Sequence, residues 1–303
     1  MQKQALLHSV PAALIAASLL GCASEKPPLM VPVTTTSTST ATSTVTTPAL
    51  APLSREQIAA IVDSPDRTAA DRTNDLRRHP VDLLTFIGAK PGWTALDVST
   101  GGGYTTELLA RVIGPTGLVW AQSRPRNPAA TPVVPAQPEG GTAAAAPVSP
   151  PRSTADVLAE RSARMKDAGV AAAPIAYAAL PFDNPVPPEA VGKLDLVTLM
   201  FNYHDFGWIP VDRAQMNRAI FAGLKPGGFY VIADHAGRPG TGISESGSLH
   251  RIEESFLRSE VEAAGFRLLA EGNFLRNPND PRDRNAPEPA QPKDEFVLKF
   301  VKP

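Results

Sequence analysis

Apolar stretches of strand length alternate with amphipathic stretches of helical spacing along most of this chain. The apolar stretches lie at 94–98, 117–122, 173–178, 193–201 and 227–235. The helical stretches lie between or after them, at 104–113, 154–169, 212–224 and 252–265. This alternation predicts a mostly parallel sheet that is covered by helices on both faces. Two final strands, at 266–274 and 295–302, have no helix between them, so we expect them to pair antiparallel.

Two helices are predicted before the first strand. The stretch 54–64 has helical spacing, and Ser54 can cap its start. The stretch 80–89 has Pro80 at its start and Gly88 near its end, which is the usual order of these two residues in a helix. The folded domain is therefore expected to begin at Ser54 and to continue to the last residue, 54–303.

The first 22 residues resemble the signal of a bacterial lipoprotein. Lys3 is followed by an apolar run too short to span a bilayer comfortably, and the run ends in "LLGC" at 19–22. Cys22 is the only cysteine and stands where this motif places the lipidated residue. An ordinary secretory signal or a buried helix is the alternative. We expect a signal peptide at 1–21 and a lipid anchor at Cys22.

The residues after Cys22 bear on where the chain is held. Ala23 and Ser24 follow it, whereas an Asp in this position is the usual signal for retention at the inner membrane. The resemblance thus implies an exported protein, anchored in the bacterial cell envelope at the outer membrane and facing the periplasm. The Thr/Ser-rich stretch 22–53 has no apolar period and is predicted to be a flexible tether.

Composition adds two limits. A Pro/Ala-rich stretch at 124–152 separates the second strand from its helix and is predicted to be a low-complexity insertion. The net charge is −1 and no basic run is present, which argues against a nucleic-acid partner. Neither observation settles the oligomeric state.

The first strand ends at Asp97 and leads into three consecutive glycines before a helix. Such a loop allows close approach to a ligand, and the helix start offers free N–H groups to an anion. A tight turn without a ligand is one alternative. Another is a dinucleotide, but Thr106 stands where the third glycine of that fingerprint belongs. Arg124 and Arg126 leave NADP open, because they could meet a 2′-phosphate.

Several further motifs identify a family that the chain resembles. They are "TALDVSTGGGYTTELLA", "KLDLVTLMFNYHD", "LKPGGFYVIADH", "LHRIEESFLRSEVEAAGF" and "DEFVLKFVKP". Over 76–303 the chain resembles class I S-adenosylmethionine-dependent methyltransferases, and within them a group of exported methyltransferases known only as predictions. The resemblance implies an α/β fold of the Rossmann-like, doubly wound type. Its sheet would have seven mostly parallel strands and an antiparallel last strand, and its cofactor would be S-adenosylmethionine.

The resemblance also implies which residues hold the cofactor. Ser99 replaces the first glycine of the family's loop, and Gln122 replaces the acid that holds the ribose hydroxyls. The family usually has an acid near the end of the third strand, but here the first acid after that strand is Asp183. The residues of this chain that the resemblance assigns to cofactor binding are Asp97, Ser99, Gly101, Gly102, Gly103 and Gln122.

Three histidines are expected at the same edge of the sheet, because each follows or ends a strand or precedes a helix there. They and their polar neighbours are His204, His235, His250, Asn202, Asp205 and Asp234. For an oxygen acceptor, we predict His204 or His235 as the base, with Asp205 or Asp234 orienting it. Asn202 stands where class I enzymes often contact the acceptor, and 276–294 could close over the site as a lid.

The histidines leave a metal open, but their spacing along the chain is too long for a metal signature, so we assign no metal ligand. The leading hypothesis is a methyltransferase acting on a small molecule or an envelope component. One alternative is an exported binding or sensor module on the same fold with a degenerate cofactor site. Another is a metal-dependent hydrolase or isomerase that uses the three histidines.

Overall fold

The computed structural model describes residues 51–125, 152–287 and 290–303. The predicted signal peptide, the lipidation site Cys22, nearly all of the tether and most of the insertion at 124–152 lie outside these residues. Within them, none of the helices combines the length and the hydropathy that crossing a membrane would require.

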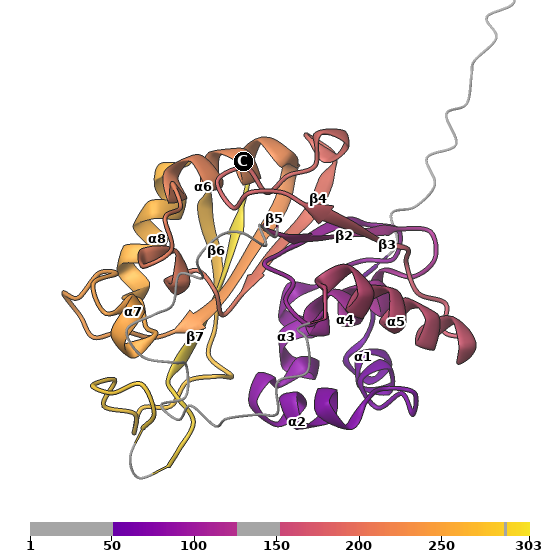
Figure 1. Cartoon of the computed structure of the whole chain (residues 1–303), viewed down its shortest axis with the longest axis horizontal. Coiled ribbons are helices and arrows are strands. Elements are labelled where there is room, and N and C mark those ends of the chain that lie inside the picture. The colour runs from indigo at the N-terminus through magenta and orange to yellow at the C-terminus, as the bar shows by residue number, and fades with distance from the viewer. Residues whose placement is uncertain (1–50, 126–151, 288–289) are drawn as a thin grey trace, which may run out of the picture. The chain divides into compact units, whose positions relative to one another are not determined.

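One sheet of seven strands runs through the described part of the chain (Figure 1). Its strands are β1 (Thr94–Val98), β2 (Leu118–Ser123), β3 (Ile175–Ala179), β4 (Leu194–Met200), β5 (Leu224–His235), β6 (Arg267–Gly272) and β7 (Glu295–Val301). The order across the sheet is β3-β2-β1-β4-β5-β7-β6. The strands from β3 to β5 pair in parallel, and β7 pairs antiparallel with both β5 and β6. The predicted fold class, including the antiparallel last strand, is confirmed.

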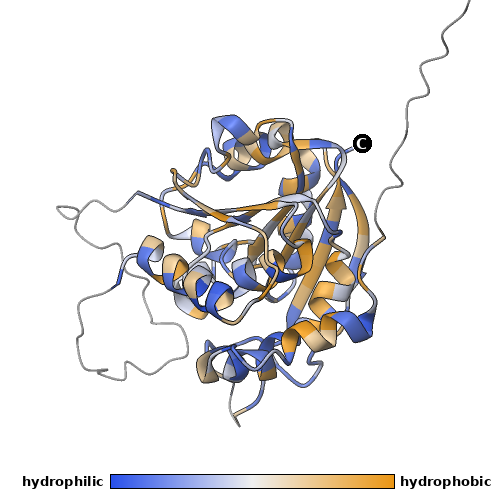
Figure 2. Cartoon of the chain, turned by 90° about the vertical axis from the view of Figure 1, so that its right-hand side faces the viewer, coloured by the Kyte–Doolittle hydropathy of each residue, from blue (hydrophilic) through white to orange (hydrophobic). Residues whose placement is uncertain are grey.

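Helices cover both faces of this sheet (Figures 1 and 2). The helices are α1 (Arg55–Val62), α2 (Ala69–Arg78), α3 (Pro80–Ile87), α4 (Tyr104–Ile113), α5 (Thr154–Asp167), α6 (Arg213–Gly223), α7 (Ser246–Leu249) and α8 (Glu254–Ala263). Two short 3₁₀ turns are η1 (Pro188–Ala190) and η2 (His204–Gly207). The side chains of α1, α3 and α4 share one buried cluster, and those of α6 and α8 share another. The sheet therefore separates two hydrophobic cores.

The predicted helix ends are confirmed where the sequence carries a clear signal. Ser54 caps α1, and Gln57 completes a reciprocal pair of hydrogen bonds with it. Pro80 opens α3, and Gly88 closes it in the left-handed conformation with a φ of 65°. In contrast, α2 was not predicted, because it buries only Asp71 and shows no apolar period.

The strand order reverses between β1 and β4, which is where a doubly wound sheet opens a crevice at the carboxyl ends of its strands. The glycine loop follows β1 at this point, and the turn η2 follows β4 beside it. The antiparallel strand β7 begins at the same edge, since Glu295 lies opposite His235, the last residue of β5. The fold thus gathers residues from distant segments at one edge.

Candidate functional site

The glycine loop takes a backbone path that most residues adopt only at a cost. Ser99, Gly101 and Gly103 have φ values of 57°, 57° and 75°. A Cβ atom on Gly103 would lie 2.8 Å from Leu158 Cδ2, so a side chain there would collide with α5. Ser99 keeps the left-handed conformation in place of a glycine, at a cost of about 1–2 kcal/mol. The loop geometry is therefore preserved despite this substitution.

Asp97 lies at the end of β1 with its carboxylate buried. Its two oxygens accept hydrogen bonds from the hydroxyls of Thr198, at 2.8 Å, and Thr106, at 2.6 Å. Burial raises the pKa of Asp97 to about 6, although both hydroxyls act to lower it. Asp97 is therefore a strongly held side chain whose charge is costly in this environment.

Gln122 supports the loop from inside the protein. Its Oε1 accepts a hydrogen bond from the Ser99 backbone N–H at 3.0 Å, and its Nε2 donates to the Leu180 carbonyl at 2.6 Å. The residue has no exposed surface. The side chain expected to replace the ribose-binding acid thus links the loop after β1 to the end of β3.

Arg161 of α5 fastens the other side of the loop. Its Nε donates to the Gly102 carbonyl at 2.6 Å. Its terminal nitrogens bind Asp71 on α2 and Glu107 on α4 at 2.6–2.9 Å. One guanidinium group therefore joins three helices to the glycine loop.

A cavity of about 200 Å³ lies against the loop, and we call it the glycine-loop cavity. Its lining comes from α2, the loop after β1, α5 and the end of β4: Asn74, Arg78, Asp97, Val98, Ser99, Thr100, Gly101, Gly102, Tyr104, Thr105, Arg161, Met200 and Asn202. Of the predicted residues, the structure thus brings Asn202, Asp97, Ser99, Gly101 and Gly102 to one cavity. Gly103 and Gln122 do not line it. The contribution of α2, with Asn74 and Arg78, was not foreseen.

The three histidines do converge, as predicted, but they form two separate groups. The ring centroid of His204 lies 5.4 Å from that of His235 and 5.5 Å from that of His250. His204 Nδ1 lies 2.6 Å from Asp234 Oδ1, and its Nε2 lies 3.2 Å from Asp205 Oδ1. His250 Nδ1 is 3.7 Å from that same Asp205 oxygen. His204 and His250 therefore share Asp205.

The carboxylates around His204 act on its pKa against the effect of burial. Burial alone would lower the pKa of His204, but the carboxylates of Asp234 and Asp205 outweigh burial and raise the pKa to about 10. Burial would raise the pKa of Asp205, but the neighbouring imidazoles of His204 and His250 hold it well below its usual range. His204 is fully buried and does not line the glycine-loop cavity.

His235 instead faces a cavity of about 380 Å³, which we call the lid cavity. The lid cavity is lined by Arg77, His235, Asn285, Ala286, Pro287, Gln291, Pro292, Lys293 and Glu295. His235 Nδ1 lies 2.9 Å from Glu295 Oε1, and that oxygen accepts from Arg77 at 3.0 Å. Sequence reasoning missed Glu295. The antiparallel pairing that was expected for β7 could have indicated it, since it brings the start of β7 to this edge.

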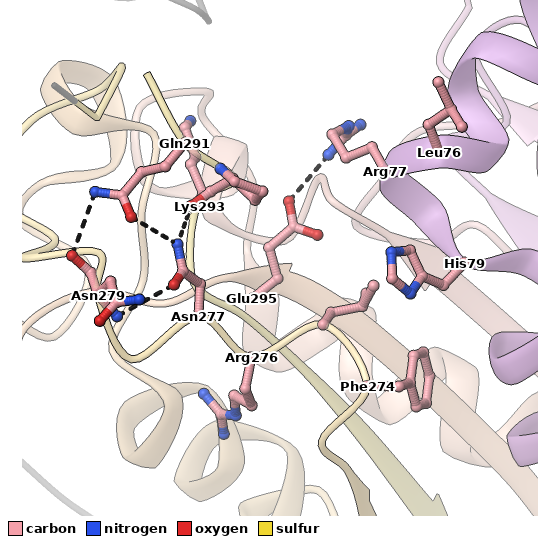
Figure 3. A pocket seen from close by; sticks show the side chains of 12 residues that line it. Leu76, Arg77, His79, Phe274, Arg276, Asn277, Asn279, Gln291, Lys293 and Glu295 are labelled. Carbon is pink, nitrogen blue, oxygen red and sulfur yellow. Dashed lines mark hydrogen bonds and ion pairs between the residues drawn. The ribbon is translucent and has the colours of Figure 1, made fainter. Parts of the chain in front are cut away.

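A neighbouring cavity of about 390 Å³ shares five of these residues and lies between α2 and the segment 274–279 (Figure 3). In Figure 3, Arg77 reaches Glu295 across this space, while Asn277, Asn279 and Gln291 bind one another on the opposite wall. The segment 276–294, predicted to be a lid, therefore lines both cavities.

Phe201 stands between the two regions. It directly follows β4 with a φ of 61°, which an aromatic residue rarely adopts. The guanidinium carbons of Arg78 and Arg77 lie 4.4 and 4.9 Å from its ring centroid, and the His235 ring lies 5.5 Å away. Arg78 lines the glycine-loop cavity and Arg77 lines the lid cavity, so consecutive residues of α2 serve both.

Comparison with known proteins gives weak similarities. No protein-family model and no curated protein matches the chain. Among solved structures, a S-adenosylmethionine-dependent methyltransferase from Aquifex aeolicus is 15% identical, with a TM-score of 0.48 over 83% of this chain and 100% of that chain. The [4+2]-cyclase SpnF is 15% identical, with a TM-score of 0.48 over 80% and 86% of the two chains. A TehB-like methyltransferase from Corynebacterium glutamicum is 13% identical, with a TM-score of 0.43 over 78% and 99%. Similarities of this size assign no activity.

Proposed function

We propose that this chain is a S-adenosylmethionine-dependent methyltransferase that acts on a small molecule or an envelope component. The observation that carries the proposal is the glycine-loop cavity at the point where the strand order reverses, beside a second cavity that presents a histidine. The motifs that resemble the class I family lead to the same conclusion.

The residues of the glycine-loop cavity suit the amino-acid end of this cofactor. Arg78 and the N–H groups at the start of α4 can bind a carboxylate. Asp97, which lines the same cavity, would supply a negative charge for the ammonium group of the cofactor. A Cβ atom on Gly102 would meet nothing within 4 Å, so the missing side chain leaves space in the cavity. At about 200 Å³ the cavity accommodates part of the cofactor, because complete small-molecule sites usually exceed about 300 Å³.

When bound, S-adenosylmethionine supplies an electrophilic methyl group. The chain must then place a nucleophilic atom in line with it and keep water away. We assign the lid cavity to the acceptor and His235 to the removal of its proton. Glu295 Oε1, 2.9 Å from His235 Nδ1, would orient the base. Asn202 would contact the acceptor from the glycine-loop cavity, and 276–294 would exclude water.

We also propose that the protein is exported and held in the cell envelope by lipid on Cys22. This part rests on the motif at 19–22 and on the Thr/Ser-rich stretch after it. Labelling of the chain with a fatty-acid analogue in cells would test it, with Cys22→Ser as the variant that should lose the label.

Calorimetric titration of the full-length protein with S-adenosylmethionine and with its demethylated product tests the cofactor assignment. The variant is Gly102→Val, because Gly102 lines the cavity, has a negative φ and has open space around an added Cβ atom. Its control is Ala168→Val, an exposed residue at the far end of α5. We expect the wild type and the control to bind alike and Gly102→Val to bind at least about tenfold more weakly, a loss of about 1.4 kcal/mol. Absence of binding to the wild type would refute the assignment.

A further inference from the structure

His204, Asp205 and His250 form a compact set of ligand atoms that no other element of the proposed function uses. One ligand atom from each lies within 4.8 Å of one from each of the others. Asp205 and His250 are 45 residues apart in the sequence, with α6 and β5 between them. The three ligands therefore do not form a short sequence motif. Two imidazole nitrogens and one carboxylate oxygen are the donors that zinc and similar divalent metals prefer.

Two of the three ligand-atom distances approach those of metal coordination. Tetrahedral ligands at the usual zinc bond lengths of about 2.0–2.1 Å stand about 3.3 Å apart. His204 Nε2 lies 3.2 Å from Asp205 Oδ1, and His250 Nδ1 lies 3.7 Å from it. His204 Nε2 is buried, and its alignment with Asp205 is too poor to count as a hydrogen bond. Small movements of the His250 ring would complete the set.

Supporting contacts hold the ligands in orientations that a metal needs. Asp234 lies 2.6 Å from His204 Nδ1, which places the proton on Nδ1 and leaves Nε2 as a donor atom. Asp205 is fixed by Asn202 Nδ2 at 2.8 Å and by Trp208 Nε1 at 3.0 Å. His250 has a φ of 52°, a backbone conformation that persists only where surrounding contacts enforce it.

The charge of the cluster also favours a cation. Asp205 and Asp234 bring two carboxylates into a nearly dry region, one on each side of the His204 ring. The neighbouring His235 is engaged with Glu295. A divalent ion bound to neutral His204 and His250 would balance both carboxylates. The Asp205 side chain is 17% exposed, which gives an ion a path to the cluster from solvent.

We infer that His204, Asp205 and His250 bind one divalent transition metal of the zinc class, with Asp234 positioning His204. Three protein ligands leave at least one coordination position for water or another ligand. The site lies at the carboxyl ends of β4 and β5, beside His235 and separate from the glycine loop. It does not depend on S-adenosylmethionine, and it requires no metal in methyl transfer.

The test uses the full-length protein, stripped with a chelator and dialysed. It is titrated with Zn²⁺ by calorimetry and with Co²⁺ by its visible absorption, which reports coordination geometry. The variant is His250→Asn, and the control is His79→Asn. Both histidines are left-handed, with φ values of 52° and 44°, and Asn tolerates that conformation. His79 is exposed and lies outside the cluster.

We expect one equivalent of Zn²⁺ in the wild type and in His79→Asn, with a Co²⁺ spectrum typical of nitrogen and oxygen ligands at low coordination number. His250→Asn should bind at least about 100-fold more weakly, and Asp234→Asn about 10–100-fold more weakly. Circular dichroism verifies that each variant is folded. Substoichiometric binding in the wild type, or equal affinities of His250→Asn and His79→Asn, would overturn the inference, and the wild-type measurement stands even where a variant does not fold.

Discussion

Arg161 offers the sharpest test of how the glycine loop is held. The replacement Arg161→Met keeps the length of the stem and the helical preference while removing the guanidinium. The Gly102 carbonyl then loses its donor, and Asp71 and Glu107 lose the ion pairs that join α2, α4 and α5. Because both carboxylates are only 1–2% exposed, neither can recover its hydration.

The structure sets the size of the effect. Removing one partner of a buried ion pair costs about 3–5 kcal/mol, since a charge is left without compensation. Here Glu107 keeps Arg111 at 2.7 Å and also contacts Arg164, while Asp71 keeps the Thr68 hydroxyl at 2.8 Å. These remaining partners reduce the loss, so we expect the free energy of unfolding to fall by about 2–4 kcal/mol.

Urea unfolding of the full-length protein measures this loss from the shift in midpoint at constant slope. The control is Arg258→Met, which breaks a pair with Glu262 on the surface of α8 at 3.1 Å. Exposed pairs of this kind contribute about 0–1 kcal/mol. If Arg161→Met unfolds within about 1 kcal/mol of Arg258→Met, the network does not anchor the loop and the reasoning fails.

Two further predictions concern the site itself. Because folding raises the pKa of Asp97 from 3.8 to about 6, its charge destabilises the fold fully above pH 6 and not at all below about pH 4. Across that pH window the wild type should lose up to about 3 kcal/mol of unfolding free energy relative to Asp97→Asn, as measured by urea unfolding at each pH. Parallel stability curves for the two proteins would contradict this prediction. If His235 is the base and Glu295 orients it, His235→Gln should lower kcat/KM for methyl transfer to envelope extracts by about 100–10,000-fold, and Glu295→Gln should lower it by less. Cofactor affinity should be unchanged in both variants, and His79→Asn should match the wild type. A change in cofactor affinity alone would refute this role.

The order of strands and helices could be predicted from periodicity, because burial of the sheet on both faces requires a clear hydrophobic pattern in the sequence. Strands β1 and β4 are almost wholly buried, and α4 begins and ends at the predicted residues. Helix α2 has no such hydrophobic pattern, because ion pairs rather than apolar contacts hold it in place. Its last residues were missed for that reason, although Arg78 lines the glycine-loop cavity and Arg77 lines the lid cavity.

The grouping of the histidines could have been foreseen only in part. Asp234 and His235 are neighbours on β5, so their side chains point to opposite faces of the sheet and cannot form one dyad. Asp234 therefore meets His204 on one side. His235 meets Glu295, which stands directly opposite it on β7. The sequence shows the alternation, but the partner of His235 depends on a register that only the folded sheet defines.

Ser99 and Gln122 are the two residues that depart from the cofactor motif of the family that the chain resembles, and they are in direct contact. Gln122 accepts from the Ser99 N–H with one end and donates to the Leu180 carbonyl with the other. A carboxylate in this place could accept but not donate, so it would leave the Leu180 carbonyl without this partner and carry a charge into a site with no exposure. Ser99 and Gln122 thus form one adaptation of the loop. For the cofactor proposed above, other groups would have to make the contacts that an acid would make with the ribose, and Arg78 and Asn74 of α2 are polar residues that line the same cavity.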